Sequence, residues 1–192
     1  MFYRFARRVL IIFARIFYRF NVSGQGYIPS GGPVILCSNH IHLLDCIMLA
    51  IFCKRQVFFM GKKELFEKPF LGWLIRKLGA FQVDRGGADL QAYRHSMQIL
   101  KDEKVLGIFS QGTRTQEFDN VKGGVAVFAL KSGATVVPVG IRGTYRVFSK
   151  MNIHFGPPIS MEEYQGQKVK SALVEEVMAK IVSQVSALTQ KK

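Results

Sequence analysis

The sequence predicts a single α/β domain, with a mainly parallel or mixed central sheet flanked by helices and preceded by an amphipathic N-terminal helix. Short apolar runs alternate with longer helical patterns, and the early runs are continuously apolar, as in strands buried on both faces. The chain has 192 residues, of which 48% are hydrophobic and 21% charged. That is enough for one well-filled core, and it excludes a disordered chain.

Residues 1–20 are the first predicted element, a helix with arginines on one side and phenylalanine and aliphatic residues on the rest. The arginines fall within an arc of roughly 120° on a helical wheel. They are Arg4, Arg7, Arg8, Arg15 and Arg19. Each charge at a bilayer centre would cost about 2.5–3.5 kcal/mol, which argues against a spanning helix. We expect a helix in the membrane interface, with its arginines on anionic headgroups. Packing on the protein's own core is the alternative.

The remaining elements follow in alternation. Residues 21–33 are rich in glycine and proline, which predicts turns with one short strand around Tyr27. Strands are expected at 33–37, 57–60, 80–83, 105–109, 134–141 and 150–155. Helices are expected at 43–52, 63–78 (in one or two pieces), 89–102, 123–132 and 171–188. Ligands of such sheets bind beyond the carboxyl ends of the strands, so functional residues are sought directly after each strand.

The net charge is the first functional indication. Lys and Arg number 27 and Asp and Glu 13, giving +14 and a pI of about 10.0. A positive surface attracts nucleic acid, anionic membranes or phosphorylated small molecules, and charge alone does not choose among them. The three cysteines lie in apolar surroundings without a C-x-x-C pair, which indicates buried, reduced thiols.

His40 and Asp45 form the first candidate site. His40 directly follows a predicted buried strand, and Asp45 begins an apolar helix. Five positions apart on one continuous helix, the two side chains would lie about 140° apart and would not meet. A turn before the helix would fold Asp45 back onto the imidazole, whose other nitrogen would then accept a proton. A structural histidine at a strand end is the alternative.

Cationic residues follow three other predicted strands. Thr113 and Arg114 follow the strand at 105–109, Lys62 follows 57–60, and Arg85 follows 80–83. Backbone N–H groups, a hydroxyl and a bidentate guanidinium together suit a phosphate. Pro138 lies inside a predicted strand, where it removes a ladder donor and indicates an edge or a bulge.

These residues together resemble a known family. Four blocks occur in order: Asn39-His40-x4-Asp45, Val83-Asp84-Arg85, Phe109-x-x-Gly112-Thr113-Arg114 and Val137-Pro138-Val139. They resemble the four blocks of the glycerophospholipid acyltransferases, in particular the bacterial 1-acyl-glycerol-3-phosphate acyltransferases. The resemblance covers about residues 21–159 and implies that residues 21–192 are an acyltransferase catalytic domain.

The resemblance implies a reaction and a role for each block. His40 would be the general base on the sn-2 hydroxyl of lysophosphatidic acid, and Asp45 would orient it and balance its charge. The hydroxyl would attack an acyl thioester of acyl carrier protein or coenzyme A, giving phosphatidic acid, with no metal or other cofactor. Arg85, Gly112, Thr113 and Arg114 would hold the acceptor phosphate, with Lys62 nearby, and Pro138 would shape the acyl-binding side.

The third block departs from the family pattern, Phe-Pro-Glu-Gly-Thr-Arg. Ser110 replaces the proline and Gln111 the glutamate, so this chain has no carboxylate at position 111. Another acceptor therefore stays open: glycerol-3-phosphate, another lysophospholipid or an amine-bearing lipid. A non-catalytic lipid-binding module is a further alternative. Nucleic acid is not expected, since no nucleic-acid motif occurs. The expected location is the cytoplasmic face of the membrane, as a peripheral protein.

Overall fold

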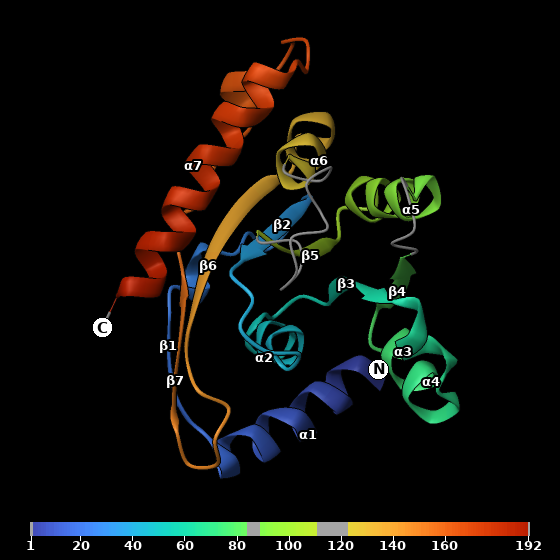
Figure 1. The fold of residues 1–192 in the computed structure, drawn as a ribbon, viewed down its shortest axis with the longest axis vertical. Coiled ribbons are helices and arrows are strands. Elements are labelled where there is room, and N and C mark those ends of the chain that lie inside the picture. The colour runs from blue at the N-terminus through green and yellow to red at the C-terminus, as the bar shows by residue number, and fades with distance from the viewer. Residues whose placement is uncertain (1, 84–88, 111–122, 192) are drawn as a thin grey trace.

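A mixed seven-stranded sheet forms the centre of the protein in a computed structural model that describes residues 2–83, 89–110 and 123–191 (Figure 1). Its spatial order is β1-β7-β6-β2-β5-β3-β4. The strands are β1 (Arg19–Ser23), β2 (Val34–Ser38), β3 (Val57–Lys62), β4 (Ala80–Val83), β5 (Val105–Phe109), β6 (Thr135–Gly143) and β7 (Lys150–Phe155). The α-helices are α1 (Phe2–Phe17), α2 (Asp45–Phe52), α3 (Lys63–Glu67), α4 (Pro69–Lys77), α5 (Leu90–Lys101), α6 (Gly124–Ser132) and α7 (Ser171–Gln190). The predicted fold class is confirmed.

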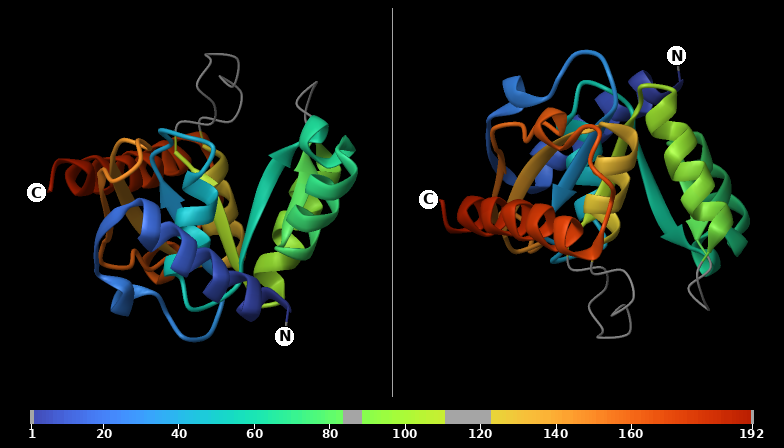
Figure 2. Two further views of the ribbon diagram at one scale, coloured as in Figure 1. Left: turned by 90° about the horizontal axis from the view of Figure 1, so that it is seen from below. Right: turned by 90° about the horizontal axis from the view of Figure 1, so that it is seen from above.

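Strand direction brings the ends of several strands to one edge. β6, β2, β5, β3 and β4 run parallel to one another, whereas β7 is antiparallel to β6 and β1 is parallel to β7. The carboxyl ends of the five parallel strands therefore share an edge, where α/β sheets bind their ligands. Pairing of β3 with β5 ends at Phe59–Gly107, and β3 and β4 diverge from the rest of the sheet beyond it (Figure 2).

Each face of the sheet has its own core. Alternation along β2 places Val34 and Leu36 in the core that α2 and part of α1 cover, and Ile35 and Cys37 in the core that α5, α6 and α7 cover. All of β2 is buried, as its uninterrupted apolar sequence predicts for a central parallel strand. Because both faces of β2 are buried, the strand is held in one register between its neighbours. The position in the sheet where β2 ends and the following turn begins is therefore fixed.

The N-terminal region differs from the prediction at its boundary. The helix ends at Phe17, and Arg19–Ser23 forms the edge strand β1, paired in parallel register with β7. The strand expected around Tyr27 is wrong, because Gln25–Tyr27 is a single 3₁₀ turn. Gly24 precedes this turn at φ 76°, a left-handed conformation that turns the chain, and a Cβ there would lie 1.9 Å from the Phe155 carbonyl oxygen.

Helix α1 has three sectors. One packs on the protein, with Ala14 buried and Leu10 and Ile11 against the core. A second carries the exposed Arg4, Arg8 and Arg15. The third is apolar and exposed, and consists of Phe2, Phe5, Ile12, Phe13, Ile16 and Phe17.

One side of α1 therefore packs on the protein's own core, which is the alternative that the sequence left open, and contact of the exposed apolar side with a membrane stays a prediction. Two arginines leave the expected headgroup arc, because Arg19 lies on β1 and the Nε of Arg7 is buried. Among the described residues, no helix combines the length and the hydropathy needed to cross a bilayer.

Pro138 lies in β6, between β2 and β7, and not at a sheet edge. The prediction of an edge is wrong, and regular pairing with β7 is interrupted beside Pro138. The β6–β7 ladder begins at Val139–Phe155, and the chain after it returns to β6 only at the Val136–Ile159 bridge. The Pro138 carbonyl accepts from Gly156 N–H at 2.8 Å. The missing N–H therefore falls where no ladder partner is needed.

Candidate active site

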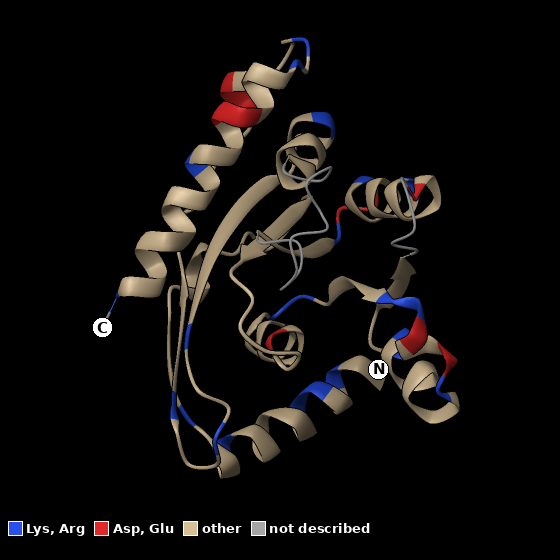
Figure 3. Cartoon of the chain, in the orientation of Figure 1, with Lys and Arg blue, Asp and Glu red and all other residues tan. Residues whose placement is uncertain are grey.

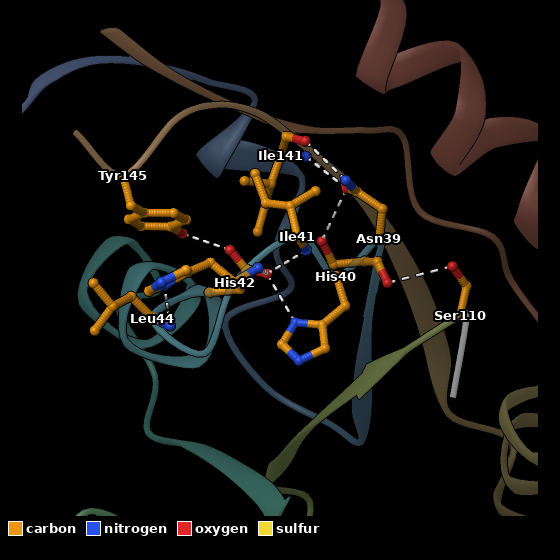
Figure 4. A network of polar contacts seen from close by, with 10 residues as sticks. Asn39, His40, Ile41, His42, Leu44, Ser110, Ile141 and Tyr145 are labelled. Atoms are coloured by element: carbon orange, nitrogen blue, oxygen red, sulfur yellow. Dashed lines mark hydrogen bonds and ion pairs between the residues drawn. The ribbon is translucent and has the colours of Figure 1, made fainter. Parts of the chain in front are cut away.

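The segment between β2 and α2 brings His40 and Asp45 together. β2 ends at Ser38, and Asp45 is the first residue of α2, so both lie at a turn and not on one continuous helix. The Asp45 N–H donates to the His42 carbonyl at 3.0 Å, which closes the turn. His40 Nδ1 lies 2.8 Å from Asp45 Oδ2 (Figure 4). The fold-back that the H-x4-D spacing required is therefore present.

The Asp45 carboxylate is fully buried and heavily hydrogen-bonded. Its Oδ2 accepts from His40 Nδ1 and from the N–H groups of Ile41 and His42, at 2.8, 2.7 and 2.8 Å, and its Oδ1 accepts from the Tyr145 hydroxyl. Burial by itself would raise the pKa of Asp45, but these hydrogen bonds outweigh it and hold the pKa below its usual value. Asp45 is therefore a carboxylate at neutral pH.

The His40 ring is oriented by its neighbours. Because Asp45 is ionised, Nδ1 carries the proton that it donates to Oδ2, and Nε2 is the nitrogen that can accept another. The ring stacks on Phe109 at the end of β5, with centroids 4.1 Å apart and planes at 21°. The side chain is 21% exposed. This arrangement has the geometry of a general base with a reachable nitrogen.

A row of aromatic rings supports this stack. Phe109 stacks on Phe59 of β3, with centroids 6.2 Å apart. Phe59 occupies the space beside Gly107, where a Cβ would lie 2.1 Å from its ring. Glycine at position 107 therefore allows the row that ends on the His40 ring.

Asn39 fixes the start of the turn. The β2–β6 ladder ends at Ser38–Val139, and the next pair is made by the Asn39 side chain. Its Nδ2 donates to the Ile141 carbonyl, and its Oδ1 accepts from the Ile141 N–H, both at 2.8 Å. The amide thus imitates a strand partner and ties the residue before His40 to β6.

Sequence reasoning did not assign roles to Asn39, Phe109 or Tyr145. Asn39 and Phe109 stand in the quoted motif blocks, so their positions were the available signal. Tyr145 is 100 residues from Asp45 in the chain and lies in the loop after β6. It reaches Asp45 because β6 and β2 are neighbours in the sheet, which no local pattern in the sequence indicates.

The other predicted residues have different outcomes. Lys62 ends β3 and is exposed on the expected edge. β5 lies between β3 and β2, and β3 diverges from β5 beyond Phe59, so Lys62 stands farther from the line of His40 than the two strand spacings of about 10 Å that a paired sheet would give. Pro138 belongs by alternation to the α7 face, and a Cβ on Gly156 would lie 3.0 Å from its ring. Arg85, Gly112, Thr113 and Arg114 lie outside the described residues.

Comparison with known proteins gives consistent matches. A family model described as Acyltransferase matches residues 19–142. The 1-acyl-sn-glycerol-3-phosphate acyltransferase of Bacillus subtilis (strain 168) is 27% identical over 168 residues, covering 84% of each chain. The enzyme of the same name from Streptococcus pneumoniae (strain ATCC BAA-255 / R6) is 26% identical over 204 residues, covering 99% of this chain and 74% of that protein.

A solved structure has the same fold. The crystal structure of the 1-acyl-sn-glycerophosphate (LPA) acyltransferase from Thermotoga maritima superposes with a TM-score of 0.73, covering 99% of this chain and 82% of that chain. The sequence identity of the pair is 23%. The likeness supports the architecture described above.

Proposed function

The chain belongs to the acyltransferase family, and we propose that it transfers an acyl group from a thioester to the sn-2 hydroxyl of 1-acyl-sn-glycerol-3-phosphate, giving phosphatidic acid. The observation that carries the proposal is the contact of His40 Nδ1 with the buried Asp45 carboxylate at the carboxyl edge of the parallel strands. The relatives from B. subtilis and S. pneumoniae have the name of this reaction. The donor is an acyl thioester of acyl carrier protein or coenzyme A.

The geometry supports a general-base mechanism. His40 Nε2 takes the proton of the acceptor hydroxyl as its oxygen attacks the thioester carbonyl, forming a C–O bond. The tetrahedral intermediate then breaks its C–S bond, and the leaving thiolate takes the proton back from His40. Asp45 stabilises the imidazolium between these steps. General-base assistance contributes about 10²- to 10⁴-fold, so positioning of the two substrates must supply the rest.

We propose that the acceptor phosphate binds Arg85, Thr113, Arg114 and the Gly112 backbone, with Lys62 at the rim. In the chain, Arg85 follows β4 and Gly112–Arg114 follow β5, and the carboxyl ends of both strands share the edge that His40 occupies. A phosphate on this edge would extend from His40 toward β3 and β4. The contribution of Pro138 to the acyl-binding side stays a prediction.

Product analysis tests the reaction and its acceptor. Lysophosphatidic acid is offered with acyl carrier protein and coenzyme A thioesters side by side, and mass spectrometry detects the products. Phosphatidic acid is expected. Glycerol-3-phosphate, another lysophospholipid and an amine-bearing lipid form the comparison panel, because Ser110 and Gln111 depart from the family's third block. If any of these acceptors is acylated faster than lysophosphatidic acid, lysophosphatidic acid is rejected as the acceptor. If no acceptor gives a product, the reaction is rejected in favour of a non-catalytic lipid-binding module.

We also propose that the exposed apolar sector of α1 lies on an anionic bilayer, on its cytoplasmic face. Phe5 and Phe13 are 66% and 57% exposed, and α1 has no acidic residue (Figure 3). The sector continues onto α4, because Phe2 meets Trp73 edge-to-face at 5.9 Å and Phe70 beside it is 74% exposed. Apolar side chains flanked by arginines are typical of interfacial helices.

Vesicle sedimentation tests the surface. Phe5→Asp with Phe13→Asp removes two apolar contacts and adds two negative charges, and we expect binding to anionic vesicles to fall at least tenfold. Val182→Asp on α7 is the matched control, since Val182 is also apolar and 44% exposed. If the α1 variant still sediments like the unaltered protein, α1 is not the bilayer contact.

A further inference from the structure

Tyr145 reaches the Asp45 carboxylate from the loop between β6 and β7. Its hydroxyl donates to Asp45 Oδ1 at 2.5 Å. His40, Ile41 and His42 all donate to the other oxygen, Oδ2. In the part of the chain that the structure describes, Tyr145 is thus the one donor to Oδ1, whereas Oδ2 accepts from three donors.

Two other rings contact the Tyr145 side chain. Its ring stacks on His42 with centroids 4.5 Å apart, and it makes a T-shaped contact with Tyr18 with centroids 5.9 Å apart. Its loop is tied to the end of α1, where Phe148 N–H donates to the Phe17 carbonyl at 2.6 Å.

The chemistry of the phenol suits this role. Burial, together with the hydrogen bond to Asp45 and its negative charge, raises the pKa of Tyr145 well above its usual value. The hydroxyl therefore stays protonated and always donates. A buried carboxylate oxygen without a donor is strongly unfavourable, so the Tyr145 bond favours the ionised form of Asp45 and one rotation of its carboxylate.

We propose that Tyr145 is a positioning residue of the acyl-transfer site, which turns Asp45 Oδ2 toward His40 and keeps Asp45 ionised. The inference rests on the proposed roles of His40 and Asp45. Tyr145 acts through Asp45 and needs no contact with either substrate. It also connects the catalytic turn to the end of α1, since the loop that carries it is hydrogen-bonded there.

Tyr145→Phe tests the proposal, because it keeps the ring on His42 and removes only the donor. The Tyr145 hydrogen bond is one of the contacts that lower the pKa of Asp45, so its loss makes the site take up a proton at higher pH. We expect the acid limb of kcat/KM to move up by about 0.5–1 pH unit. We expect kcat at pH 7 to fall about 10- to 100-fold, with the acceptor KM changing less than about twofold.

Two comparisons separate this role from general packing. Tyr27→Phe alters an exposed tyrosine in the 3₁₀ turn and is expected to leave the pH profile unchanged. In an Asp45→Asn background, Tyr145→Phe is expected to cost less than about twofold, because the residue it acts through is already neutral. An unchanged acid limb, or the full loss in the Asp45→Asn background, overturns the proposal.

Thermal unfolding provides a test that needs no substrate. The depressed pKa of folded Asp45 adds stability above the unfolded value near 3.9, and this stability is lost as the pH falls through the folded value. The Tm of Tyr145→Phe is expected to lie below that of the unaltered protein at pH 7, and the gap to shrink as the carboxyl protonates.

A Tm gap of equal size at all pH values contradicts the Asp45 link. If the unaltered protein forms no phosphatidic acid, the proposed acceptor is rejected, and the proposal for Tyr145 is not. The kinetic comparison is then made with whichever acceptor gives product, and the unfolding comparison stands without one.

Discussion

Asp45→Asn isolates the charge of the buried carboxylate. Asparagine has nearly the same shape, and its carbonyl can take the place of Oδ2 and accept from His40 and from Ile41 N–H. Its amide would then face Tyr145, whose hydroxyl can turn to accept. The hydrogen bonds can thus be kept while the negative charge beside the imidazolium is lost. Folding is expected to survive, with a loss of about 1–3 kcal/mol in the free energy of unfolding.

The loss of rate follows from the distance between the two groups. His40 Nδ1 and Asp45 Oδ2 are 2.8 Å apart. With charge centres about 4 Å apart and an effective dielectric constant of about 20, the attraction lost from the imidazolium is about 4 kcal/mol. At 1.36 kcal/mol per tenfold, kcat is expected to fall about 10³-fold.

The assay is release of the donor thiol, with formation of the acylated product confirmed by mass spectrometry. Asp102→Asn is the matched control, because Asp102 is an exposed carboxylate paired with Lys104, and its loss is expected to leave kcat unchanged. Circular dichroism checks that both variants fold. If folded Asp45→Asn keeps more than a tenth of the unaltered kcat, the charge does not support the base and the reasoning is wrong.

The other predictions concern the base, the row of rings and the thiols. His40→Ala is expected to remove turnover and to leave folding and vesicle binding intact, whereas His95→Ala, an exposed histidine, keeps turnover; turnover at the unaltered rate would count against His40. Gly107→Ala is expected to lower the free energy of unfolding by about 1–3 kcal/mol in urea titrations, because its Cβ would meet Phe59, and an unchanged midpoint would show that the ring moves freely. Burial, and then the charge of Asp45, raises the pKa of Cys46 to about 12, so at pH 8 the folded protein should react slowly with a disulfide reagent and the denatured protein rapidly.

Local patterns predicted most of the elements. Uninterrupted apolar runs predicted parallel strands buried on both faces, and β2 and β5 are such strands. Asp89 was predicted near the start of a helix, and its carboxylate accepts from Ala92 N–H at 2.9 Å as an N-cap. These features depend on neighbours within a few residues, so the sequence contains the information directly.

Features that depend on distant partners were not predicted. Arg19–Ser23 continues an arginine-rich helical pattern, yet it forms β1, because the free edge of β7 offers hydrogen bonds to an extended chain. The pairing of Asn39 with Ile141 likewise exists only because β2 and β6 are neighbours. Propensity is weak beside such tertiary partners.

For the site, the sequence alone determined which groups are available: an imidazole after a strand, a carboxylate five residues later and cations after other strands. Tertiary structure decided how they act, because it buried Asp45 completely and supplied Tyr145 to its second oxygen. A motif specifies residue types and spacing, whereas ionisation and orientation depend on dehydration and on donors that only sheet order brings together.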